Sequence, residues 1–217
     1  DSAIDALIDA DYNVSVGSSS LSADTYGSRS TALGHTALAT QNFTTATDSY
    51  NTAVGFQAGQ SVTTATHNTL IGGNAGAALI DADNNVALRV SALVLDTYGS
   101  NSVAIGTSAL ATQNFTTATD SYNTAVGNKA GAAVTTGQSN TLIGGLAGDA
   151  ITTGSENTAV GYRALSTEDG NGLNTAIGVD SLMTQNAGAN AYNTAVGYHS
   201  GKLITTGVQN TLIGGLA

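Results

Sequence analysis

The chain has 217 residues, of which 15 are acidic and 5 basic, giving a formal net charge of −10 at pH 7. This acidic balance argues against a surface that binds phosphate backbones, so we expect no nucleic-acid partner. There is no cysteine, which excludes disulfides and thiolate metal sites, and no apolar run reaches the length of a transmembrane helix, so we expect no membrane insertion.

A repeated phrase organises the chain. The segment ALATQNFTTATDSYNTAVG at residues 37–55 recurs unchanged at 109–127. Aligned on the glycine that closes NTAVG, here called the anchor glycine, most copies are 17 residues long, and two coils of 21 residues end near Gly55 and Gly127. One copy is degenerate: NNVALRV has Arg89 in place of the anchor glycine. With this degenerate copy included, twelve copies cover the chain. We interpret residues 1–217 as a single repeat array within a longer fibre chain.

A short strand is predicted at the NTAVG motif of every copy. The residue three before the anchor is always β-branched, and the residue one before it is Val, Ile or Leu, which favours a strand over a helix. We expect the stretch after the GxxA motif to supply a second strand and the return. The residue before each anchor, for example Val126 or Ile143, is expected to be buried. The predicted motifs span residues 13–17, 30–34, 51–55, 68–72, 85–89, 102–106, 123–127, 140–144, 157–161, 174–178, 193–197 and 210–214.

These features predict an all-β fold, a parallel β-solenoid (β-roll) of about twelve 17-residue coils. So short a coil has room inside only for small side chains and one aliphatic layer, in agreement with the small residue three after each anchor, as at Ala58, Ala130 and Ala147. A second apolar stripe is left over, and association of three chains would cover it. The alternative is a monomeric solenoid whose stripe faces inward.

The residue four before the anchor is Asn in ten copies and Ser in two. Stacked coils would align these amides, so we predict a structural ladder of side chains rather than a ligand site. Its members include Asn51, Asn68, Asn123, Asn140, Asn157, Asn174, Asn193 and Asn210.

The two 21-residue coils each carry four extra residues within NFTTATDSY. Insertions in a solenoid map to surface loops, and loops carry recognition, which makes these loops candidates for contact with a receptor. The alternative is that the Phe and Tyr rings fold back and plug the widened coil. The candidate residues are Phe43, Asp48 and Tyr50 in the first loop and Phe115, Asp120 and Tyr122 in the second.

Catalytic and metal-binding patterns are weak. A fibre-borne polysaccharide-cleaving enzyme would need two opposed carboxylates, but Glu156, Glu168 and Asp169 lie in turn-like stretches and no second pair recurs, so we expect solvated turn residues and no enzyme. His35, His67 and His199 occupy different columns, and no metal or other cofactor is expected. Thr-Thr pairs begin at residues 63, 135, 152 and 205; because adjacent hydroxyls point to opposite faces of a strand, an ice-binding solenoid is a weaker alternative.

The phrases NSVAIGTSALAT at 101–112 and NTAVGYRAL resemble the head repeats of trimeric autotransporter adhesins, and the variants NTAVGFQAG and NTLIGG are similar to repeat arrays in phage tail fibres. The resemblance covers nearly the whole chain. It implies a left-handed homotrimeric β-roll on a virion tail fibre or a bacterial cell surface, outside the cell, with a host receptor or glycan as partner. Adhesin heads usually have shorter coils, and stalk heptads, a membrane anchor and a self-cleaving chaperone segment are missing from these residues.

Overall fold

The computed structural model describes residues 2–217, which form an all-β parallel solenoid of about twelve coils, as predicted. Each coil contributes one three-residue strand at its NTAVG motif. No helix occurs among residues 2–217, and so none of them belongs to a helix that could cross a membrane.

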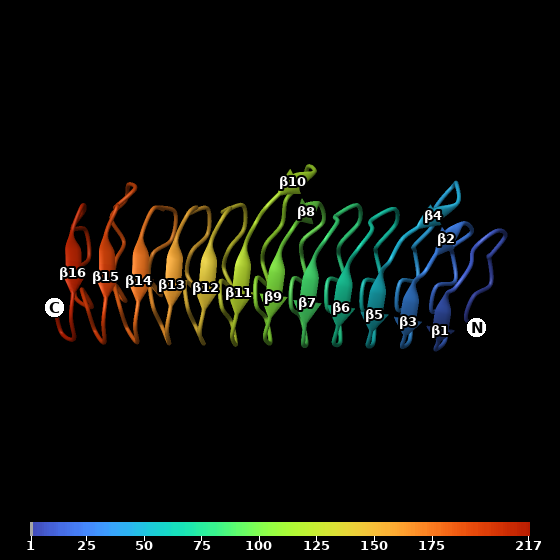
Figure 1. The fold of residues 1–217 in the computed structure, drawn as a ribbon, viewed down its shortest axis with the longest axis horizontal. Helices are drawn as coiled ribbons and strands as arrows, with labels where there is room; N and C mark the ends of the chain where they lie inside the picture. The colour runs from blue at the N-terminus through green and yellow to red at the C-terminus, as the bar shows by residue number, and fades with distance from the viewer. Residues whose placement is uncertain (1) are drawn as a thin grey trace. The chain divides into compact units, whose positions relative to one another are not determined.

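The chain contains two compact units, and the first comprises residues 1–102 with 114–120. Its main strands pair in parallel and lie side by side in chain order (Figure 1). Equivalent residues pair without a slip; Thr52 is opposite Thr69 and Val54 is opposite Ile71. The strands are β1 (Val14–Val16), β3 (Thr31–Leu33), β5 (Thr52–Val54), β6 (Thr69–Ile71) and β7 (Val86–Leu88).

The second unit comprises residues 103–113 with 121–217. Its strands also pair in parallel in chain order, with Ala125 opposite Leu142 and Leu142 opposite Ala159. Because the register never slips, each position of the repeat forms a straight column within the unit. The strands are β9 (Val103–Ile105), β11 (Thr124–Val126), β12 (Thr141–Ile143), β13 (Thr158–Val160), β14 (Thr175–Ile177), β15 (Thr194–Val196) and β16 (Thr211–Ile213).

The prediction of a second strand in every coil is wrong. Among residues 2–217, short second strands occur only beside the 21-residue coils, where β2 (Gly27–Ser28) pairs with β4 (Thr47–Asp48) and β8 (Gly99–Ser100) pairs with β10 (Thr119–Asp120). Both pairs stand off the main row of strands (Figure 1). In the other coils the return consists of tight turns, in which non-glycine residues repeatedly adopt positive φ. Because a coil has only 17 residues and three of them form the strand, most of the remaining residues lie in turns.

The inner face of the strand also differs from the expectation. The residue two before the anchor, not one before it, points inward, and Ala53, Leu70, Ala125 and Leu142 are fully buried. Alternation along a strand then directs the next residue outward, and Ile143 is 39% exposed. Val126 is likewise half-exposed, so the prediction that Val126 and Ile143 are buried within the chain is wrong. The physical reason is the thin interior, which accommodates Ala more readily than a full column of Val and Ile.

The interior alternates between two packing solutions. Where the fourth residue after the anchor is glycine, as at Gly131, the seventh is aliphatic, here Val134, and a Cβ on Gly131 would lie 2.6 Å from Leu142 Cδ1. Where the fourth residue is Leu, as at Leu110, the seventh is polar, here Gln113, and both are fully buried. Each coil therefore offers one large apolar space, which either position can fill.

The anchor position requires glycine because neighbouring coils come very close there. Gly55 has φ 140°, and a Cβ on it would lie 2.6 Å from the carbonyl oxygen of Gly72. Only Gly adopts this conformation without strain. In the degenerate copy the anchor position is occupied by Arg89, a non-glycine residue, which has φ 95°.

Candidate functional site

The asparagine column joins successive coils from within. Asn123 Oδ1 accepts the backbone N–H of Asn140 at 2.9 Å, and Asn140 Oδ1 accepts that of Asn157 at 3.0 Å. The amide nitrogen of Asn123 bonds to the same following coil and donates to the carbonyl of Gly137 at 2.7 Å. The same pattern recurs at Asn51, Asn68 and Asn193. Asn174 Oδ1 accepts the N–H of Asn193, and the half-buried Asn210 donates its own N–H to Asn193 Oδ1. These buried side chains satisfy backbone groups and leave no room for a ligand role.

A buried carboxylate precedes each lengthened coil. Asp24, Asp96 and Glu168 lie at 72-residue intervals, and all three are fully buried. Asp24 Oδ1 accepts the N–H of Gly27 at 2.9 Å, and its Oδ2 accepts Gln41 Nε2 at 2.6 Å. N–H donors thus satisfy this carboxylate without a cation.

The third carboxylate is held less completely. The coil that ends at Gly197 is two residues shorter than its 21-residue equivalents and has no Phe. Glu168 Oε1 accepts Asn171 Nδ2 at 3.1 Å, but Glu168 Oε2 and Gln185 Nε2 are buried without a partner. Burial raises the pKa of the Glu168 carboxyl, because the charged form loses hydration there.

The insertion loops combine buried rings with exposed polar groups. Phe43 and Phe115 are each only 5% exposed and pack against Gly27 and Gly99 respectively, which places both rings inside the widened coils. The expectation that the Phe rings contact a receptor is therefore corrected: they plug the coil, because an apolar ring gains most by filling that space.

The other loop candidates lie on the surface. Asp48, Tyr50, Asp120 and Tyr122 are exposed. In the first loop Arg29 Nε contacts Asp48 Oδ1 at 2.9 Å, and the Arg29 guanidinium lies 5.7 Å from the ring centre of Tyr50. In the second, Asn101 Nδ2 donates to Asp120 Oδ1 at 2.7 Å. The two loops have one sequence but different neighbours.

The outer face of the strands is a regular half-exposed surface. In each unit it presents one column of mostly Thr, three before the anchor, and one column of Val, Ile or Leu, one before it. Ile71, Ile143 and Ile177 are the more exposed members in mid-array coils. No described residue covers these columns, so an apolar stripe continues from coil to coil within each unit.

A cluster of cations surrounds Asp180 on the turns of three successive coils. Arg163 Nε and Nη2 each contact the Asp180 carboxylate at 2.9 Å, Lys202 Nζ contacts it at 2.8 Å, and His199 Nε2 lies 3.2 Å away. The hydrogen bonds from Arg163, with the help of Lys202, lower the pKa of Asp180 to about 2. The cluster links consecutive coils as an ionic clamp.

The residues examined for catalysis and metal binding do not converge. Glu168 is buried, whereas Glu156 and Asp169 are exposed. His35 stacks on Phe56, His67 on Tyr50 and His199 on Tyr198. Within residues 2–217, no group of three or more His, Cys, Asp or Glu side chains could hold a metal ion.

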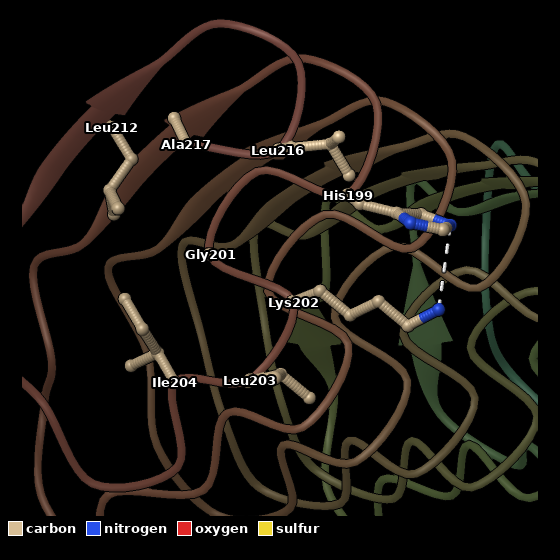
Figure 2. Close-up of a pocket in the computed structure, with 8 residues that line it drawn as sticks. All are labelled: His199, Gly201, Lys202, Leu203, Ile204, Leu212, Leu216 and Ala217. Atoms are coloured by element: carbon tan, nitrogen blue, oxygen red, sulfur yellow. Dashed lines mark hydrogen bonds between the residues drawn. The ribbon is translucent and has the colours of Figure 1, made fainter.

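An apolar pocket of about 560 Å³ lies at the last described coils (Figure 2). Ile204, Leu212 and Leu216 form its apolar lining, while Lys202 and His199 lie together at its side, 3.4 Å apart between Nζ and Nε2. The equivalent residues of the preceding coils, Leu142 and Ile151, are fully buried. The pocket is therefore the inner layer of the solenoid where no further described coil covers it.

Comparison with known proteins gives no match: no family model, no curated protein and no solved structure resembles the chain significantly. The outer strand face and the insertion loops are thus the candidate sites on structural grounds alone.

Sequence reasoning missed the buried acids and the Asp180 clamp. Asp24 and Asp96 occupy a column that is aliphatic or Gln in most other coils, and their 72-residue spacing was a usable signal. The clamp carried no such signal, because Arg163, Asp180 and His199 share a column only after the 19-residue coil is aligned.

Proposed function

We propose that this chain is a structural and adhesive segment of a homotrimeric fibre, displayed on a virion tail or a bacterial cell surface, that contributes to attachment to a host receptor or glycan. The role is mechanical and adhesive rather than catalytic. The resemblance of the repeat phrases to adhesin heads and tail-fibre arrays supports the extracellular location and a left-handed coil.

The uncovered outer face is the observation that carries the proposal. This face repeats a column of mostly Thr and a column of Val, Ile or Leu from coil to coil, although neither column fills the interior of the solenoid. A soluble monomer rarely exposes a continuous apolar stripe, and such a stripe marks an interaction surface. Further copies of this chain would match this face best. If the copies are related by a rotation axis parallel to the solenoid, each coil meets the same coil of its neighbours at the same level.

The insertion loops support the adhesive part of the proposal. They lie away from the strand face, where a trimer would leave them accessible, and each presents an exposed Asp and Tyr. Loops held by a rigid scaffold are suited to recognition. Asp48 in the first loop and Asp120 in the second are the exposed residues that would contact a partner.

Light scattering tests the assembly. The chain has a mass of 21.4 kDa, and we expect a particle of three times that mass at micromolar concentration. A stable monomer would contradict the proposal. Binding of labelled protein to host cells tests the adhesive role: the double variant Asp48→Ala with Asp120→Ala, which changes one exposed carboxylate in each loop, should bind less than the wild-type chain while remaining trimeric.

A second candidate, ice binding, is favoured by one observation. Thr and an aliphatic residue alternate outward on most strands, as in Thr141 and Ile143, and form parallel rows on a sheet. Such rows could order water at the same face that a trimer would cover. Inhibition of ice recrystallisation by a monomeric protein would favour this candidate, whereas a trimer without that activity would exclude it.

A further inference from the structure

We propose that neighbouring copies in the fibre meet along a seam of paired columns, in which the residue five before each anchor contacts the residue one after the same anchor in the next copy. This inference rests on the trimer proposed above. It names the residues that would align each coil of one copy with the same coil of the next copy along the fibre axis.

The two columns flank each strand at its opposite ends. Positions four and two before the anchor are buried, as at Asn51 and Ala53, whereas Tyr50 has φ 50° in the turn before the strand and Phe56 follows the anchor glycine in the turn after it. Tyr50 and Phe56, which flank β5, are 48% and 54% exposed. When strand faces surround a common axis in parallel, the beginning of one strand lies next to the end of its neighbour's strand at the same height.

Residue character matches across the two columns. Tyr50 and Phe56 are both aromatic and exposed, and so are Tyr192 and Tyr198. In a coil of the second unit, Leu173 is half-buried and Val179 is 40% exposed, so both are aliphatic. Large apolar side chains therefore occur at both ends of the same strand, as contact between copies requires.

Small and polar residues are matched as well. Ser139 and Gly145 are both small, and Asn101 and Thr107 are both polar. In most other coils a larger side chain corresponds to a smaller one, as for His67 and Gly73. Asn84 and Val90 flank the strand of the degenerate copy and do not match in polarity.

Charge agrees with the same arrangement in one further coil. Glu156 is exposed at the start of β13, and Tyr162 with Arg163 follows at its end. Across the seam, the Glu156 carboxylate of one copy would approach the Tyr162 hydroxyl and the guanidinium of Arg163 in the next. The surplus positive charge of the Asp180 clamp would face this carboxylate.

Cysteine cross-linking tests the seam directly, because the chain has no cysteine of its own. In the double variant Tyr50→Cys with Phe56→Cys, the strand Thr52–Val54 separates the two thiols within one chain by three residues of about 3.3 Å each, with further residues on both sides. A disulfide requires Cα atoms within roughly 7 Å, so these thiols can bond only between chains. We expect mild oxidation to give disulfide-linked trimers on a non-reducing gel.

Mismatched pairs provide the control. Tyr50→Cys with Val90→Cys places the thiols two coils apart in height, about 10 Å, and should give little cross-linked trimer.

The pair Leu173→Cys with Val179→Cys repeats the test in the second unit. Single-cysteine variants should remain uncross-linked; efficient dimers from them would indicate an antiparallel contact and contradict the seam.

The outcomes separate this inference from the proposed function. A trimeric mass with no cross-linking of either matched pair would overturn the seam and leave the trimer standing. A monomeric mass would overturn both. Cross-linking that stops at dimers in a trimeric particle would also contradict a seam repeated around three copies.

Discussion

Asn51 Oδ1 accepts the backbone N–H of Asn68 at 2.9 Å, and Asn68 Nδ2 donates to the carbonyl of Ala82 at 2.8 Å. Asn68 Oδ1 in turn accepts the backbone N–H of Asn85 at 2.9 Å, so one side chain serves two backbone groups of the following coil. Because these groups are buried, their hydrogen bonds hold the solenoid together at a point where apolar contact is thin.

Asn68→Ala should therefore destabilise the fold by roughly 2–3 kcal/mol, since it leaves the N–H of Asn85 and the carbonyl of Ala82 buried without a partner. Urea unfolding monitored by circular dichroism measures the change. Asn128→Ala is the matched control, because Asn128 is exposed and should cost less than about 0.5 kcal/mol. Equal effects of the two variants would show that the ladder is dispensable.

Ala125 and Val126 are neighbours on opposite faces of β11, and they separate folding from assembly. Ala125→Asp places a charge in the buried interior and should cost several kcal/mol, preventing folding. Val126→Asp places the charge on the outer face, so the monomer should fold and the trimer should be lost. Circular dichroism reports the first effect and light scattering the second.

The opposite result would be equally informative. If Val126→Asp unfolded the isolated chain while Ala125→Asp did not, Val126 would lie in the interior and Ala125 on the outer face. If Val126→Asp remained trimeric, the strand face would not be the contact between copies.

Arg89→Gly should stabilise the chain. Arg89 has φ 95° at a position where the other coils have glycine, and relief of such strain is worth about 1 kcal/mol. Arg89→Ala keeps the Cβ and the strain while removing the charge, so it should give no comparable gain. An increase in melting temperature for the Ala variant equal to that of the Gly variant would assign the effect to charge.

Asp180 should make stability depend on pH in the acid range. Its pKa is lowered from 3.8 to about 2, so the stabilisation is fully present above about pH 4 and is lost as the pH falls toward 2. A shift of this size corresponds to about 2 kcal/mol. Asp180→Asn should lower the urea midpoint at pH 7, and the gap from the wild-type chain should close between pH 4 and 2.

Asp5→Asn is the control for that series, because Asp5 is exposed and is not part of the clamp. A gap for Asp180→Asn that persisted undiminished at pH 2 would show that the clamp acts through packing rather than through the charge of its carboxylate.

The fold could be predicted from sequence because its cause is periodic. A coil of fixed length places Asn51 over Asn68 and Ala53 over Leu70, so the spacing alone predicts parallel pairing and columns. The small residue at Ala58 and Ala130 likewise indicated a thin interior, and both are fully buried.

The direction in which the strand faces could not be predicted with the same certainty. Ala53 and Val54 are both apolar, and the pattern alone does not decide which one fills the interior; the thin interior, which accommodates Ala more readily, decides it. The burial of Phe43 was similarly open, since a loop ring can project or fold back. The contacts of Asp180 depend on turns of unusual conformation that no propensity encodes.

The 72-residue spacing of Asp24, Asp96 and Glu168 has a consequence for how such an array can change its length. Four coils form the smallest block after which every interior side chain finds the neighbours it had before. Recombination between the identical segments at 37–55 and 109–127 would remove or duplicate one whole block, and the buried acid would again precede a coil with a buried glutamine. Loss of a single coil could instead separate a buried acid from its glutamine, as Asp24 from Gln41. Natural length variants should therefore differ by whole blocks of four coils.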